Sequence, residues 1–230
     1  MIRVLVWCEN IQNKTQESVK AVYPEGMHNT IADFLSADPY LSVTTATLDD
    51  ESCGITKEKL EQTDVVLWWG HTGHNLVPDE VVELLYEAVV RNGLGIICLH
   101  SAHYSKIFKR LMGTTCSLRI PKTGYGHAPE KLWTLLPGHP IAAGIPQPVD
   151  IEIEENYNEP FDIPQPDELV FNAAFDHCGS FRAGATYHRG RGKVFYFQPG
   201  HETYPIYRQK EIQDVIFNAV YWANNKTRGQ

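Results

Sequence analysis

The sequence lacks the features of several protein classes. Its five cysteines are odd in number and scattered, and no Cys-x-x-Cys pair occurs, which excludes a disulfide framework and a cysteine-rich zinc knuckle. No run of about 18 apolar residues is present to span a bilayer. The N-terminal "MIRVLVWCEN" lacks the apolar stretch and cleavage site of a signal peptide. The net charge of −8 argues against nucleic acid or an anionic membrane as a partner. We therefore expect a cytoplasmic protein.

The composition and the order of the patterns indicate an α/β fold. Hydrophobic residues make up 43% of the chain and charged residues 21%, which predicts a packed core, and 230 residues suit a single domain over 1–230. Apolar or β-branched runs at 2–8, 41–48, 64–70 and 95–99 alternate with helical patterns at 26–38, 56–63, 78–93 and 101–113. This alternation predicts a doubly wound, parallel sheet.

The C-terminal half has a different pattern. Strand-like runs separated by proline and glycine occur at 131–136, 150–157, 168–175, 183–189 and 192–200. We expect these strands to extend the sheet, partly in antiparallel orientation, and 207–225 to follow as an amphipathic helix. The apolar helical stretches 81–90 and 216–222 are long enough to serve either the core or a homo-oligomer interface.

Histidine recurs directly after separate predicted strands. The residues concerned follow the third, fourth and last strands and begin the first helix: His71 and His74, His100 and His103, His201 and Glu202, and His28. Ligands of open α/β sheets bind outside the carboxyl ends of the strands. We therefore predict that at least three of His28, His71, His100 and His201 share one cleft. The remaining histidines are assigned to loops or exposed strand positions: His127, His139, His177 and His188.

Such a cleft can use histidine in two ways, and the sequence leaves both open. Neutral imidazoles bind Zn²⁺ or a similar ion, commonly together with a carboxylate. Histidine also acts as a general acid or base near neutral pH without a metal. The His-x-x-His spacing at 71–74 and 100–103 is a weak metal signal, because it is not the His-Glu-x-x-His helix motif that places both rings on one face.

A nucleophile is harder to find. The turn from strand to helix that exposes a nucleophile requires small residues two positions to either side. His100 meets this requirement, with Cys98 and Ala102 as its flanks, whereas Cys98 itself lies inside an apolar run and is expected to be an inert buried thiol. Ser101 suits a helix N-cap as well as it suits a nucleophile.

The acidic segment 150–160 offers four glutamates. Alternation along a strand places Glu152 and Glu154 on one face and Glu155 with Tyr157 on the other. We expect most of these carboxylates to be solvated, and we select Glu155 for the site.

Several long blocks of the chain together resemble the ThuA-like proteins, a family named for trehalose utilisation. The blocks include "YPEGMHNTIADFL", "TDVVLWWGHTGHNLVPDEVVE", "GLGIICLHSAHYSKIFKRLMGT", "EENYNEPFDIPQPDELVF" and "GRGKVFYFQPGHETYP". The resemblance covers nearly the whole chain and implies a flavodoxin-like domain of the class I glutamine amidotransferase type. Glutaminase chemistry is not implied, since His100 stands where those enzymes have their elbow cysteine.

The resemblance also extends to individual residues. The positions that match the family pattern are His28, His71, His100, Glu155 and His201, with His103 and Glu202 as further matches. Our hypothesis for these positions is that His100 and Glu155 are catalytic and that His28, His71 and His201 bind a divalent metal, with zinc favoured and no nucleotide cofactor expected. The substrate contacts that we expect are His103, Tyr104, Tyr157 and Glu202. Tyr125 is a further candidate for the wall of a sugar pocket, whereas Trp68 and Trp69, within a strand, are expected in the core.

Our leading hypothesis is an enzyme of carbohydrate catabolism, a hydrolase or isomerase that acts on a disaccharide or a keto-sugar. Two alternatives remain. One is a sugar- or partner-binding module without catalysis on an amidotransferase-like fold, because fold does not fix function. The other is a metal-dependent hydrolase of a substrate that is not a sugar.

Overall fold

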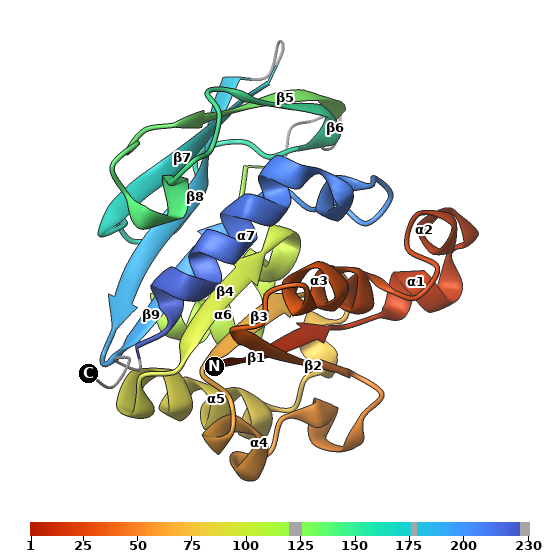
Figure 1. Ribbon diagram of the computed structural model, residues 1–230, viewed down its shortest axis with the longest axis vertical. Coiled ribbons are helices and arrows are strands. Elements are labelled where there is room, and N and C mark those ends of the chain that lie inside the picture. Colours follow the sequence, from red (N-terminus) through yellow and green to blue (C-terminus); the bar gives the residue numbers. More distant parts are fainter. Residues whose placement is uncertain (120–125, 176–178, 226–230) are drawn as a thin grey trace.

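In the computed structural model, which describes residues 1–119, 126–175 and 179–225, the strands form one nine-stranded sheet in the order β2-β1-β3-β4-β9-β8-β7-β5-β6 (Figure 1). Five strands run parallel: β1 (Ile2–Cys8), β2 (Leu41–Thr47), β3 (Val65–Trp69), β4 (Gly95–Leu99) and β9 (Gly192–Phe197). Four continue the sheet in antiparallel orientation: β8 (Gly179–Arg189), β7 (Glu168–Phe175), β5 (Gly126–Thr134) and β6 (Val149–Asn156). The predicted fold class is confirmed.

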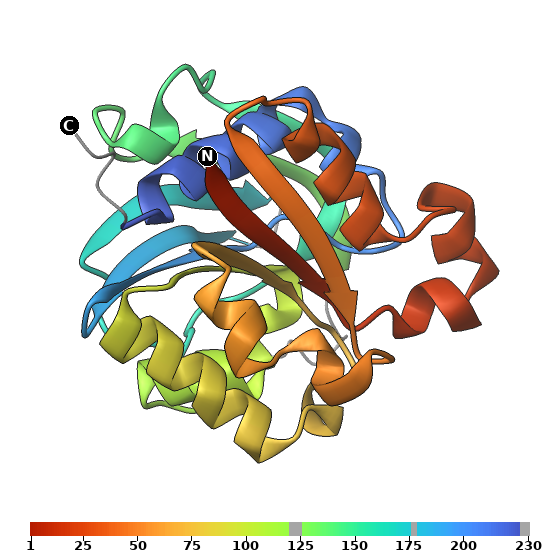
Figure 2. The same cartoon turned by 60° about the horizontal axis from the view of Figure 1, so that its bottom comes forward.

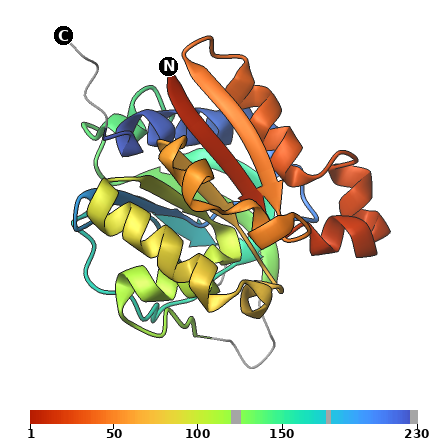
Figure 3. The ribbon, with the colours of Figure 1, turned by 90° about the horizontal axis from the view of Figure 1, so that it is seen from below.

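Helices cover both faces of the parallel strands (Figure 3). The helices on one face are α3 (Met27–Ser36) and α7 (Lys210–Ala223), and those on the other are α4 (Lys57–Glu61), α5 (Asp79–Asn92) and α6 (Lys106–Met112). Every residue of β3 and β4 is buried, as expected for strands covered on both faces. Gly95 permits the close approach of α7 to β4, because a Cβ there would lie 2.5 Å from the carbonyl oxygen of Ala223.

Two local features differ from the predicted elements. The short helices α1 (Ile11–Thr15) and α2 (Glu17–Val22), which project beside the sheet in Figure 2, were not predicted, because they bury only Gln12 and Val19. The helix predicted at 101–113 begins instead as a 3₁₀ turn, His100–Tyr104, and α6 starts after Ser105, whose hydroxyl caps it by accepting from the Phe108 amide. Among the described residues, no helix combines the length and apolar character needed to cross a bilayer.

Candidate active site

His100 occupies the turn that follows β4. Its φ of +53° is a left-handed backbone conformation, which is uncommon for a residue with a side chain and costs free energy unless the surroundings hold it in place. Its flanking residues, Cys98 and Ala102, are fully buried, in keeping with a turn that tolerates only small neighbours. The imidazole is itself buried, and its Nδ1 lies 3.0 Å from the carbonyl oxygen of Gln198, to which it donates. This bond fixes the ring so that Nε2 faces the site.

The Nε2 atom of His100 meets two groups from the antiparallel half of the sheet. It lies 3.3 Å from Oε2 of Glu155 and 3.3 Å from the hydroxyl of Tyr157, and that hydroxyl lies 2.6 Å from Oγ of Ser101. Four strands separate β4 from β6 in the sheet order, so the antiparallel half must curl over the carboxyl edge of the parallel strands. This curvature brings the predicted catalytic pair, His100 and Glu155, into contact.

His71 and Glu202 form a second pair at the same edge. Nδ1 of His71 lies 2.9 Å and 3.0 Å from the two carboxylate oxygens of Glu202, so it donates to that carboxylate and leaves Nε2 for a proton or a ligand. The loop that carries His71 is held by Glu9, whose buried carboxylate accepts from the backbone amides of residues 71, 72 and 73 at 2.8 Å each. The polar residue after β1 is therefore a support for the loop after β3.

His201 lies between the two pairs. Its ring centroid is 5.6 Å from that of His71 and 5.4 Å from that of His100. Its Nδ1 contacts the hydroxyl of Thr203 at 2.8 Å. Among the described residues, two sets of three side chains could hold a metal ion, and within each set the potential ligand atoms lie within 4.8 Å of one another. These sets share His201 and are His71–His201–Glu202 and His100–Glu155–His201.

The carboxylates determine the charges within this cluster. Burial opposes a charge on His100, but the hydrogen bond to Glu155 and the nearby carboxylates outweigh it and raise the pKa of His100 to about 9. Burial acts against the charge of Glu155 and Glu202 as well, yet their bonded histidines bring the pKa of each carboxyl down to about 2. Burial lowers the pKa of His201 to about 4. At neutral pH the site therefore holds a cationic His100, two carboxylates and a neutral His201.

The structure places three predicted site residues outside this cluster. His28, at the start of α3, belongs to neither set of potential metal ligands among the described residues, and its ring packs against Gly26. His103 lies behind Tyr157, with ring centroids 5.4 Å apart, and its Nδ1 donates to the Cys116 carbonyl at 2.9 Å. Tyr104 packs on His103 at 4.2 Å. Their roles in binding stay predictions.

Two residues of the site region were not predicted. His127 lies at an exposed position of strand β5, as predicted, but its nearness to the site was not expected, since its ring is 5.0 Å from that of His201. Glu154, expected in solvent with most of its neighbours, is fully buried. No sequence signal marks either residue, because both positions depend on how β5 and β6 curl over the site. Tyr125 and His177 lie outside the described residues.

The tryptophans of β3 lie in the core as expected. Trp68 stacks on Trp7 with ring centroids 3.7 Å apart. Trp69 also borders the site, since its ring lies parallel to that of His100 with centroids 6.5 Å apart and its Nε1 donates to the Gly200 carbonyl at 3.1 Å. Trp69 therefore supports the site from the core side.

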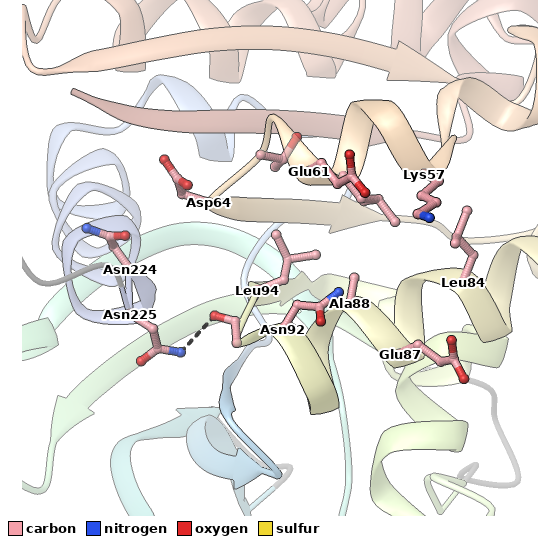
Figure 4. Close-up of a pocket in the computed structure, with 13 residues that line it drawn as sticks. Lys57, Glu61, Asp64, Leu84, Glu87, Ala88, Asn92, Leu94, Asn224 and Asn225 are labelled. Atoms are coloured by element: carbon pink, nitrogen blue, oxygen red, sulfur yellow. Dashed lines mark hydrogen bonds between the residues drawn. The ribbon is translucent and has the colours of Figure 1, made fainter.

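A cavity of about 620 Å³ lies at the opposite end of the parallel strands from the histidine cluster (Figure 4). Asp64 and Leu94, which precede β3 and β4, line it together with residues of α4 and α5. None of its lining residues belongs to the histidine cluster. The cavity thus lies at the amino ends of the strands, away from the edge where α/β sheets bind their ligands.

Solved structures share this fold at low sequence identity. A ThuA-like protein from Bacteroides uniformis ATCC 8492 is 15% identical, with a TM-score of 0.70 over 99% of this chain and 93% of its own. A cytoplasmic protein from Salmonella typhimurium LT2 is 11% identical, with a TM-score of 0.63 over 97% and 100%. A chain in the structure of PurLQS from Thermotoga maritima is 14% identical, with a TM-score of 0.58 over 96% and 98%. No curated protein matches the sequence.

The topology and these similarities define an α/β protein with the fold of the class I glutamine amidotransferases. The family model ThuA, described as trehalose utilisation, matches residues 3–223. The chain belongs to the ThuA family, which confirms the resemblance found in its sequence.

Proposed function

We propose that this protein is an enzyme of carbohydrate catabolism that acts on a disaccharide or a keto-sugar. The observation that carries the proposal is the contact between His100, at the turn after β4, and Glu155, within a cluster that also holds His71, His201 and Glu202. An acid and a base side by side at a ligand-binding edge suit proton transfer at a substrate carbon. The family description, trehalose utilisation, supports a sugar as the substrate.

A keto-sugar makes this arrangement productive. A carbonyl acidifies the neighbouring C–H bond, and the Glu155 carboxylate serves as the base that removes the proton. The C–H electron pair then forms an enolate, whose oxygen accepts a hydrogen bond from a protein donor. Collapse of the enolate expels the glycosidic oxygen, which takes the Nε2 proton of cationic His100. This elimination cleaves a glycosidic bond without the carboxylate spacing of ordinary glycosidases.

The donor set also fits a divalent metal. In the set His71–His201–Glu202, two imidazole nitrogens and a carboxylate oxygen form a combination typical of zinc. With a metal on Nε2 of His71, one Glu202 oxygen would keep its bond to Nδ1 and fix the ring, as carboxylates commonly do for metal-binding histidines, and the other oxygen would be available to the metal. A bound zinc would supply Lewis-acid stabilisation of the enolate oxygen. Of the three proposed metal ligands, His28 has the least support from the geometry, because it belongs to neither set among the described residues.

The first experiment is elemental analysis of the protein purified without added metal, beside a His71→Ala, His201→Ala double variant. About one zinc per chain, lost in the double variant, is the expected result for a metal site. A protein that stays free of metal after soaking would leave these histidines as acid–base or hydrogen-bonding groups.

The second experiment follows exchange of the substrate C–H with deuterium from the solvent, using a 3-keto-disaccharide and its parent sugar. We expect His100→Gln to abolish cleavage and Glu155→Gln to abolish exchange. The control is His188→Gln, because His188 is exposed and pairs with Asp167 on the surface. Unchanged turnover in His100→Gln would end the proposal. Sugar binding without product under every metal condition would favour the binding module, and turnover of other substrates alone would favour the hydrolase.

A further inference from the structure

A group of buried polar side chains lies next to the site and has no part in the proposed chemistry. Glu130 on β5, Glu154 on β6 and Gln198 directly after β9 are 1%, 0% and 0% exposed. Charged or polar groups are seldom buried to this extent without partners, because each loses its hydration. Their hydrogen bonds therefore show how the group is built.

Burial raises the pKa of the Glu154 carboxyl to about 7, and its hydrogen bonds offset part of that burial. Its carboxylate accepts from the backbone amides of Glu155 at 2.8 Å, Gly200 at 2.6 Å and His201 at 3.2 Å. Backbone donors directed at a carboxylate favour its ionised form. Glu154 thereby ties β6 to the loop after β9, and so it holds Glu155 and His201 in their relative positions.

Glu130 has the opposite environment. Neither of its carboxyl oxygens has a hydrogen-bond partner among the described residues, and the side-chain oxygen Oε1 of Gln198 has none either. Glu154 from β6 and Tyr196 from β9 are the titratable groups that interact with Glu130, and neither supplies a cation. Two neighbouring buried carboxyls resist ionising together, so one of them keeps a proton. Because Glu154 has the amide donors, the proton belongs on Glu130.

We infer that Glu130 is a positioning residue, held as the neutral acid, which donates its proton to Oε1 of Gln198 and thereby fixes the His100–Glu155 pair. This proton supplies the donor that Oε1 of Gln198 otherwise lacks. Gln198 then acts on both members of the pair, since its Nε2 donates to the Glu155 carbonyl at 3.1 Å and its own carbonyl accepts from Nδ1 of His100 at 3.0 Å. Burial first and Glu154 second raise the pKa of Glu130 well above its usual range, and they outweigh the opposite effect of the neighbouring Gln198 side chain. The functional consequence rests on the proposed function, whereas the protonation state does not.

Infrared spectroscopy at about pH 8.5, above the pKa of about 7 of Glu154, tests the protonation state of Glu130 without any substrate. We expect the carbonyl stretch of a protonated carboxyl in the wild type, its loss in Glu130→Gln and its retention in Glu152→Gln, a control at an exposed position of β6. The absence of this band from the wild type, or its persistence in Glu130→Gln, would overturn the inference. Glu130→Gln keeps the shape of the side chain and a hydrogen-bond donor. If Glu130→Leu fails to fold, the test therefore rests on Glu130→Gln.

The positioning role is tested by the titration of His100, followed by NMR, and by steady-state kinetics. We expect Glu130→Gln to preserve both, because its amide still donates to Gln198. Glu130→Leu should shift the His100 titration and lower kcat roughly 10- to 100-fold, the range expected for a misplaced catalytic group. A His100 titration that is the same in Glu130→Leu as in the wild type would refute the role. An infrared result as expected, with no sugar activity, would leave the buried acid established and the proposed function wrong.

Discussion

Replacement of His103 by asparagine should remove part of the acid sensitivity of the fold. His103 is 1% exposed, and its Nδ1 donates to the Cys116 carbonyl, a bond that the asparagine amide can reproduce. Burial lowers the pKa of His103 to about 3. A histidine in the unfolded chain titrates near pH ~6.5, so between these values the unfolded state binds more protons than the folded state. Stability therefore falls as the pH falls from about 6.5 towards 3.

The magnitude follows from this difference in pKa. Each pH unit within the window changes the free energy of unfolding by about 1.4 kcal/mol for one group. Between pH 6.5 and pH 5 the His103 contribution is thus roughly 2 kcal/mol. The pKa values of His74 and His201 are also lowered, to about 4, but both residues are present in wild type and variant and cancel in the comparison.

The assay is urea unfolding of the wild type and His103→Asn at pH 7 and pH 5. The variant loses packing at both pH values, so only the difference between the two pH values carries information. We expect the wild type to lose roughly 2 kcal/mol more than the variant. An equal loss in both proteins would refute the reasoning, because it would mean that the buried ring takes up its proton as readily as an exposed one.

Three further substitutions test the supports of the site. Gly200→Ala should destabilise the fold by about 1–3 kcal/mol, because a Cβ there would lie 2.0 Å from the hydroxyl oxygen of Tyr207. In thermal unfolding, the double variant Gly200→Ala, Tyr207→Phe should recover part of this loss, because it lacks that oxygen. Glu9→Gln should cost roughly 3 kcal/mol in urea unfolding, since three amides lose a charged acceptor, and a loss under 0.5 kcal/mol would contradict this. Glu202→Gln should weaken zinc binding about 10- to 100-fold in calorimetric titration by releasing the His71 ring, and an unchanged affinity would exclude that role.

The parallel half of the fold and part of the site could be predicted from the sequence because their signals are local. The apolar runs and helical periodicity identify each strand and helix, and the carboxyl ends of parallel strands necessarily meet at one edge. His71, His100 and His201 follow strands β3, β4 and β9, and the structure brings the three together. His28 follows a longer connection after β1, where adjacency to a strand end no longer determines position.

The antiparallel half could be predicted only as strands. Their order, and the curvature that carries β6 over the end of β4, depend on pairings between residues far apart in the chain. Alternation correctly separates Glu154 from Glu155, yet it cannot show that β6 is covered on both faces there, so that both carboxyls are buried. The same long-range pairing brings His127 beside His201.

The left-handed turn at His100 has a consequence for how such a protein changes its chemistry. The strand before this position and the 3₁₀ turn after it set the direction of the side chain, whatever that side chain is. The fold thus specifies a location without specifying the reactive group that occupies it. A single substitution at residue 100 can replace one kind of reactivity by another, provided that Glu155 and Tyr157 can accommodate the new group. Shared architecture at 14% identity is then compatible with unrelated reactions.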